Sequence, residues 1–303
     1  HASRAGSPAR AAACAGAEEQ GCFQAVGLLV PRAQLPRGCR QEALQEATEA
    51  VRAACADTAP IGPQGALRLA LGSDLKVADA VVKWLQAIQW RESNDMDAVR
   101  DRVAGVCRRG GSSPAALFPH HDEVYQKLIK VSPCALKTER GAPVSVWRMQ
   151  SANDSRAASV PDQKVREWSG SVFEYLDWWV HEESQHRGRL VGYVEVYDFK
   201  GVSLRQVMSG DLRAKVEPVL RPKSYYAGVC QRVYIINAST MFNACWPLFR
   251  SFLSPGAEGI IEIDSGIPDA LLGELGGGDE AKRRLEAVLN SAAPTAVLRP
   301  GNL

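Results

Sequence analysis

Three runs of residues decide the fold: Val191-Gly-Tyr-Val-Glu-Val-Tyr-Asp-Phe-Lys-Gly201, Tyr234-Ile-Ile-Asn-Ala238 and Trp246-Pro-Leu-Phe-Arg-Ser-Phe-Leu-Ser-Pro255. The first two are rich in β-branched and aromatic residues, which favour strands, and a polar connection with helical character separates them. The third is an apolar helical segment closed by a proline. Two strands joined across a helix form a βαβ unit, so we predict an α/β fold with a mainly parallel sheet.

The composition is that of an ordinary globular protein. Of the 303 residues, 46% are hydrophobic and 23% are charged, and the chain is long enough to bury a core of its own. The net charge of +2 comes without a cluster of Lys or Arg, so we expect no nucleic-acid partner. No apolar run approaches the roughly 20 residues that cross a bilayer, so we expect membrane contact to be peripheral.

The eight cysteines are scattered, with no Cys-x-x-Cys and no Cys/His grouping of zinc spacing. This usage predicts reduced thiols in an intracellular protein. A disulfide-bearing leader in a secreted chain is the alternative, because half of the cysteines come early, at Cys14, Cys22, Cys39 and Cys55.

The N-terminal third divides into two parts. Residues 1–41 begin at His1 and are rich in Ala, Gly and Arg, so we expect a disordered, low-complexity leader outside the fold. Residues 42–110 are expected to form a helical module. Its helices are expected over Gln41–Ala56, over Gln64–Leu71, along the apolar positions from Val77 to Ile88, and after a cap at Asn94 or Asp95.

The remaining residues, 111–295, supply the sheet and the helices around it. The loop Arg108-Arg-Gly-Gly-Ser-Ser-Pro114 marks the boundary, and Pro143–Met149 is expected to be the first strand. Gly259–Asp264 is expected to add another strand, and Glu280–Asn290 a final helix.

A long helix precedes the central strand. Its apolar residues recur on one helical face, at Val165, Trp168, Val172, Leu176 and Trp179. We expect this stripe to pack in the core rather than to contact a ligand or a membrane. His181 and His186 near its end are five residues apart and cannot share a face, so we expect no metal.

The same residues resemble the CRAL-TRIO lipid-transfer family, as a divergent member. Five features stand in the family's order over about residues 64 to 278: Trp90-Arg91, Asp198-Phe-Lys-Gly201, Tyr225-Tyr226, the Tyr-Ile-Ile-Asn strand with Phe-Leu-x-Pro after it, and Gly276-Gly277. The resemblance implies that residues 111–295 hold a lipid in a hydrophobic pocket on one face of the sheet, closed by a gating helix.

The predicted pocket and gate follow from strand alternation and from the resemblance. Tyr193, Glu195 and Tyr197 share one face of the central strand, and family members contact ligands at the positions of the first two. The pocket residues we predict are Ser145, Trp147, Tyr193, Glu195, Tyr197, Tyr234 and Ile236. The gating residues we predict are Trp246, Phe249, Phe252 and Leu253, for which permanent core packing is the alternative.

Glu195 is the polar candidate within this set. It lies either in the pocket or on a solvated rim. A carboxylate inside the pocket is costly unless it is paired, hydrogen-bonded or protonated, so it would select a ligand with a hydroxyl or an amine.

The family's phosphoinositide-binding residues are missing. Members that bind phosphatidylinositol carry Pro-Glu-Arg after the paired tyrosines and a Thr/Lys pair after Phe-Leu-x-Pro. This chain has Ala227, Gly228 and Val229 at the first site, and Ala257 and Ile260 at the second. Side-chain donors for an inositol phosphate are absent at these positions, so we expect a different hydrophobic ligand.

The sequence therefore predicts a cytoplasmic lipid carrier that contacts membranes transiently. No Gly-x-Ser-x-Gly elbow, His-Glu-x-x-His helix or dinucleotide fingerprint is present, so we expect neither catalysis nor a cofactor. The alternative is a non-transferring interaction or regulatory module on the same fold, because Tyr193 and Tyr197 could fill the cavity. We also consider a protein partner that binds the N-terminal region.

Overall fold

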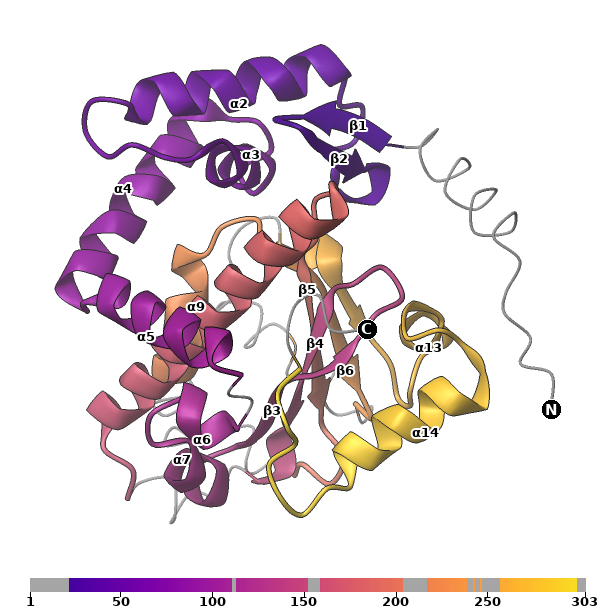
Figure 1. Cartoon of the computed structure of the whole chain (residues 1–303). Helices are drawn as coiled ribbons and strands as arrows, with labels where there is room; N and C mark the ends of the chain where they lie inside the picture. Colours follow the sequence, from indigo (N-terminus) through magenta and orange to yellow (C-terminus); the bar gives the residue numbers. More distant parts are fainter. Residues whose placement is uncertain are drawn as a thin grey trace.

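The computed structural model describes residues 22–110, 113–151, 159–203, 217–238, 242, 246 and 257–298. Its centre is a five-stranded sheet in the order β3-β4-β5-β6-β7. The strands are β3 (Lys130–Lys137), β4 (Pro143–Arg148), β5 (Tyr193–Asp198), β6 (Cys230–Ile236) and β7 (Ile261–Ile263). Strands β4 to β7 are parallel and β3 is an antiparallel edge, which confirms the mainly parallel α/β fold (Figure 1).

Helices cover both faces of this sheet (Figure 1). One face packs against α9 (Asp162–Arg187), and α5 (Met96–Arg108), α6 (Pro114–Leu117) and α7 (His121–Lys127) join the same apolar cluster. The other face packs against α13 (Asp269–Glu274) and α14 (Gly278–Leu289). Short 3-10 turns complete the described elements: η1 (Arg32–Gln34), η2 (Met149–Ser151), η3 (Arg221–Tyr225) and η4 (Ala257–Ile260).

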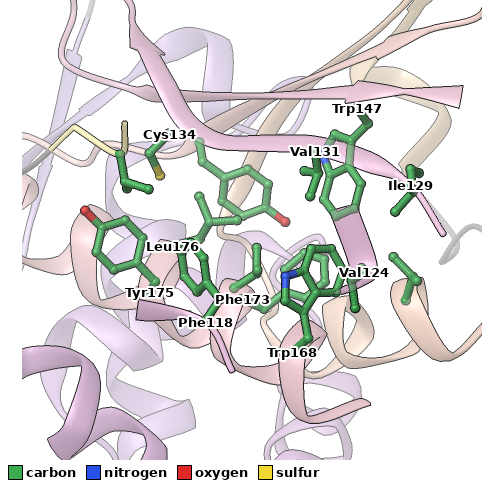
Figure 2. Packing of buried hydrophobic residues seen from close by; sticks show 14 of the residues in the cluster. Phe118, Val124, Ile129, Val131, Cys134, Trp147, Trp168, Phe173, Tyr175 and Leu176 are labelled. Atoms are coloured by element: carbon green, nitrogen blue, oxygen red, sulfur yellow. The ribbon is translucent and has the colours of Figure 1, made fainter. Parts of the chain in front are cut away.

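The apolar stripe of α9 is core, as predicted. Its five predicted residues, from Val165 to Trp179, are fully buried. Figure 2 shows Trp168, Phe173 and Leu176 pointing toward the strand that carries Trp147. A helix this long buries one continuous face because apolar residues recur every three to four positions along it. That face fixes α9 against the sheet.

The N-terminal helices also form where the sequence predicts them: α2 (Gln41–Cys55), α3 (Pro63–Leu71) and α4 (Val77–Ser93). They share a small apolar cluster that includes Val51, Leu69 and Ala80. Asp95 is the residue that precedes α5, as expected, but its side chain makes no capping hydrogen bond and its backbone is left-handed, with φ of 50°. Only the position of this helix start was therefore predicted, not its chemistry.

The expectation of a leader outside the fold is wrong for residues 22–34. Strands β1 (Cys22–Ala25) and β2 (Leu28–Pro31) form a hairpin around Val26-Gly27, where both residues have positive φ. The Leu29 N–H donates to the Gly188 carbonyl at 2.9 Å, and Leu29 accepts from the Leu190 N–H at 2.7 Å. The hairpin is too short to be recognised by alternation, and it is stabilised by docking on the turn after α9.

The expectation that Pro143–Met149 supplies the first strand is also wrong, because β3 precedes it. Pro133 lies within β3, and a proline inside an apolar run argues against a strand. The structure accommodates it at the edge of the sheet, with a register shift between Ser132 and Leu136. Cys134 within this bulge has φ of 48°.

Arg68 of α3 joins the N-terminal helices to the sheet domain. It is buried, and its guanidinium donates to the carbonyls of Val191 at 2.7 Å, Val180 at 3.3 Å and Gly228 at 3.3 Å, and to the Ser184 hydroxyl at 3.1 Å. Burial lowers the pKa of Arg68 to about 10. A buried cation with this many acceptors is compensated, so it fixes the two parts against each other.

Candidate functional site

The central strand β5 presents Tyr193, Glu195 and Tyr197 toward α9. Both tyrosines belong to the apolar cluster on that face of the sheet. The parallel register places Ser145 of β4 beside Glu195, and Trp147 beside Tyr197. These five predicted pocket residues therefore lie on one face, as strand alternation requires.

The other two predicted pocket residues do not lie on this face. Tyr234 and Ile236 of β6 pack with Leu271 on the opposite side of the sheet, and the Tyr234 hydroxyl donates to Glu274 Oε1 at 3.0 Å. The α9-facing positions of β6 are Val233 and Ile235 instead. The prediction was wrong because a shift of one residue moves a strand's side chains to the other face, and the sequence does not fix that register.

Glu195 lies in the interior and not on a solvated rim. Its side chain is fully buried, and its Oε2 atom forms an ion pair with Lys223 Nζ from η3. The Cys230 thiol at the start of β6 also lies near Oε2, at 3.9 Å. About a quarter of the Lys223 side chain is exposed, so this ion pair lies between the buried face and the surface.

The groups around Glu195 have strongly shifted pKa values. Burial and the nearby carboxylate raise the pKa of Tyr197 well above its usual range, and burial does the same for Tyr193. Burial also raises the pKa of the Cys230 thiol to about 12. Burial opposes the charge on Lys223, but the neighbouring Cys230 and Glu195 outweigh it, so the Lys223 pKa is raised. The cluster therefore contains one carboxylate and one ammonium, with neutral tyrosines and a neutral thiol.

Three polar atoms on this face are buried without a hydrogen-bond partner among the described residues: Glu195 Oε1, the Tyr193 hydroxyl and Trp147 Nε1. Ser145 differs, because its hydroxyl accepts from the Cys134 N–H at 3.1 Å and holds the bulge of β3. Buried polar atoms in folded proteins nearly always have a partner, so each exception requires an explanation. Here they gather on two neighbouring strands.

Aromatic rings fill much of the space beside them. Trp147 stacks on Tyr197 at 5.7 Å between ring centroids. It also contacts Trp168 edge to face at 6.1 Å and lies 6.5 Å from Phe173 (Figure 2). Such contacts stabilise the interface between α9 and the sheet.

The predicted gating residues Phe249, Phe252 and Leu253 lie outside the described residues. Trp246 is described and half-buried, and its ring lies 6.1 Å from that of Phe242. Phe242 in turn contacts Phe199 at 4.5 Å. Trp246 is therefore joined to the end of the central strand through two aromatic rings.

The paired tyrosines after Lys223 connect the site to the N-terminal helices. Trp90 stacks on Tyr225 at 4.7 Å and contacts Tyr226 edge to face at 6.0 Å. The Tyr226 hydroxyl donates to Glu174 of α9 at 2.7 Å. Trp90-Arg91 and Tyr225-Tyr226, which are far apart in the sequence, thus form one contact.

Glu174 is the centre of that contact. Its carboxylate is fully buried and also accepts hydrogen bonds from Arg91, at 2.8 and 3.3 Å, and from Arg100, at 2.9 Å. Arg100 reaches Asp177 at 2.9 Å as well. Two cations on one buried carboxylate compensate the cost of taking it out of water.

Gly228 explains one departure from the family pattern. It has φ of +66°, and a Cβ atom there would lie 2.2 Å from the carbonyl oxygen of Arg68. Gly72 lies equally close to Gly228, because a Cβ atom added at position 72 would lie 2.8 Å from the Gly228 nitrogen. A side chain at position 228 is therefore excluded by the close packing of α3 against this loop.

Asp198 and Asn237 fix the carboxyl ends of the two central strands. Asp198 Oδ1 accepts from the Asn237 amide at 2.7 Å and from the Lys200 N–H at 3.0 Å. Gly201 follows with φ of +74°, against the side chain of Gln150. The Asp-Phe-Lys-Gly motif is thus a turn that ends β5, with a structural role.

The described part of the chain has neither a metal site nor a membrane-spanning helix. No group of three His, Cys, Asp or Glu side chains is placed to hold a metal ion there. Within the same residues, no helix has the length and apolar character needed to cross a membrane.

Comparison with known proteins identifies the class of this fold. Residues 137–273 match the family model of the CRAL/TRIO domain. This match supports a CRAL/TRIO domain over these residues, and CRAL/TRIO domains bind or transfer lipids. A solved chain described as "Crystal structure of Sfh5" is similar, with 13% identity and a TM-score of 0.48, and the match covers 87% of this chain and 93% of that chain. The comparison with curated proteins gives no match.

Lys223 and Cys230 are site residues that the sequence analysis missed. Lys223 stands just before the paired tyrosines, but nothing in its neighbours indicates that it reaches a strand 28 residues earlier. The only sequence signal was the other half of the pair, since a buried carboxylate requires a partner.

Proposed function

We propose that this protein binds a hydrophobic lipid on the α9-facing side of the sheet and transfers it between membranes or presents it there. One observation carries the proposal. Glu195 Oε1, the Tyr193 hydroxyl and Trp147 Nε1 are buried on one apolar face and lack partners in the described residues. A ligand with an apolar body and a polar end would pack on this face and supply hydrogen-bond partners for these three atoms.

The energetics of lipid exchange explain why a carrier is needed. Exposing a methylene to water costs about 0.8 kcal/mol, so a chain of about 16 carbons resists leaving a bilayer by more than about 10 kcal/mol. A protein face lined by aromatic and aliphatic side chains lowers that cost because the chain moves between two apolar environments.

We also propose that phosphatidylinositol is disfavoured as the ligand. The close packing of Gly228 against α3 leaves no room for the side chain that the phosphoinositide-binding pattern places in this segment. Glu195 Oε1 faces the same side as Tyr193, and as an acceptor it cannot form a hydrogen bond with an ionised phosphate. Both features support a ligand without a phosphorylated inositol.

Membrane contact is part of this proposal. We propose a cytoplasmic protein that touches membranes transiently through Trp246 and the apolar residues after it, which the sequence predicts as a gate. We propose that a leader precedes the folded part, which begins with residues 22–34. Residues 42–110 then form an N-terminal helical module, and residues 111–295 form a lipid-binding domain. The N-terminal helices remain the proposed surface for a protein partner.

A second function is supported by the packing of Trp147. Its ring is fully buried between Tyr197, Trp168 and Phe173, so side chains already occupy much of this face. A face filled in this way supports an interaction module that transfers no lipid.

The experiment that separates the two is native mass spectrometry of the purified protein before and after incubation with mixed liposomes, followed by extraction of any bound lipid. The carrier predicts a stoichiometric lipid adduct and accelerated transfer between vesicles. A protein that stays empty after incubation supports the interaction module instead.

A further inference from the structure

The neighbours of the Glu195 carboxylate lie on one side of it. The Lys223 ammonium and the neutral Cys230 thiol are both near Oε2, whereas Oε1 has no hydrogen-bond partner among the described residues. Among the described residues, neither Glu195 nor Lys223 forms a second ion pair. The pair is therefore neutral as a unit, with one acceptor atom left open.

The open atom has a companion of the same kind. The hydroxyl of Tyr193, two residues earlier on the same face of β5, is also buried, and within the described residues it has the Cys230 thiol beside it but no nitrogen or oxygen partner. A carboxylate oxygen can only accept a hydrogen bond, whereas a phenol can both donate and accept. Glu195 Oε1 can accept a hydrogen bond from a ligand hydroxyl, and the Tyr193 hydroxyl can donate one to it. The two groups together therefore suit a hydroxyl on the ligand.

We propose that Lys223 sets the charge of the ligand: by neutralising Glu195, it makes the site select an uncharged lipid that ends in a hydroxyl. This inference rests on the proposed function. A carboxylate or phosphate on the ligand meets an acceptor, Oε1, that it cannot satisfy. An ammonium on the ligand competes with Lys223 for one carboxylate and leaves an unbalanced buried cation. The selectivity thus comes from rejecting both kinds of charge.

The position of Lys223 is fixed from outside the face. The residues that follow it in the chain, Tyr225 and Tyr226, are held by stacking on Trp90 and by the hydrogen bond to Glu174. Lys223 therefore reaches Glu195 from an anchored segment. An anchored cation neutralises the carboxylate in the absence of ligand, and no ligand charge is needed to complete the site.

The test compares three probes with the same alkyl chain: hexadecanol, hexadecanoate and hexadecylamine. Their affinities are measured at pH 7.5 by native mass spectrometry and by competition in detergent-free solution. The wild-type protein is expected to bind hexadecanol at least about tenfold more tightly than either charged probe.

Two single substitutions should shift that preference in opposite directions. Lys223→Met leaves an unpaired carboxylate, so hexadecylamine gains at least about tenfold relative to hexadecanol. Glu195→Gln leaves an unpaired ammonium, so hexadecanoate gains by a similar factor. The double variant is neutral again and returns to the wild-type order. Lys127→Met, which removes a lysine that pairs with Glu123 on α7, leaves the order unchanged.

The outcomes separate this inference from the proposed function. If no probe binds to any variant, the proposed function fails, and this inference fails with it. If all probes bind with the same relative affinities in the wild type and both single variants, lipid binding stands and the role of Lys223 is refuted. Either single variant suffices if the other does not fold. A wild-type protein that prefers a charged probe refutes the inference without any variant.

Discussion

Replacing Glu174 with glutamine should destabilise this protein more than any conservative change on the exposed side of α9. The carboxylate is fully buried and accepts three hydrogen bonds from Arg91 and Arg100 and one from the Tyr226 hydroxyl. Glutamine keeps the size of the side chain, but it removes the charge and replaces one oxygen with a donor. Two arginines then face an amide that cannot satisfy them.

The expected cost follows from these contacts. A hydrogen bond to a charged group contributes about 1.5–3 kcal/mol and a neutral one about 0.5–1.5 kcal/mol, so three weakened bonds lose about 3 kcal/mol. At least one N–H or O–H donor of Arg91, Arg100 or Tyr226 also faces the new NH2 group of glutamine and loses its acceptor. The total loss of unfolding free energy then lies in the range of about 3–5 kcal/mol that is typical of a broken buried ion pair.

The assay is urea unfolding at pH 7 and 25 °C, followed by tryptophan fluorescence. The matched control is Asp177→Asn, one turn further along α9, where the carboxylate is partly exposed and forms an ion pair with Arg100. That control should cost less than about 1 kcal/mol. If Glu174→Gln costs no more than Asp177→Asn, Glu174 is not the centre that holds the N-terminal helices to α9, and our reading of the paired tyrosines is wrong.

Three further predictions concern other parts of the fold. Gly228→Ala should cost more than about 3 kcal/mol in urea unfolding, whereas Gly188→Ala, with similar φ but open space around it, should cost about 1 kcal/mol; equal costs would exclude the close contact with α3. Burial lowers the pKa of His121 to about 4, so it binds its proton more weakly in the folded state, and its contribution to stability is complete above about pH 6.5 and lost as pH falls toward 4. His121→Gln should flatten the dependence of unfolding free energy on pH in this window, and an unchanged slope would refute the assignment. Val30→Ala should cost about 2 kcal/mol because the hairpin side chain is fully buried, while Val26→Ala at the exposed turn should change stability by less than about 0.5 kcal/mol; equal small effects would show that the hairpin does not support the fold.

Local periodicity was sufficient to predict most of the elements. The apolar stripe from Val165 to Trp179 identified α9 and its buried face, since a helix of this length repeats its pattern many times. The alternation in Tyr193–Tyr197 placed those side chains on one face of β5. The hairpin at residues 22–31 and the strand β3 were missed because one is too short for a repeat and the other contains Pro133.

The candidate site was predicted in part. The sequence left Glu195 either in the pocket or on a solvated rim, and it indicated that the carboxylate requires a partner if it is buried. It did not indicate Lys223, and it placed Tyr234 and Ile236 on the wrong side of the sheet. Each of these depends on how separate segments are aligned, and no residue in either segment carries that information alone.

The sequence by itself determined the α/β class, most of the elements and the resemblance to the CRAL/TRIO family, because these follow from local periods and from motifs that keep their order along the chain. Tertiary structure decided which face of β6 meets α9, which cation neutralises Glu195, and that Trp90 and Arg91 meet Tyr225, Tyr226 and Glu174. The physical reason is one of range. Helical and strand patterns arise from neighbours a few residues apart, whereas strand register and ion-pair partners arise from packing between segments that lie far apart in the chain.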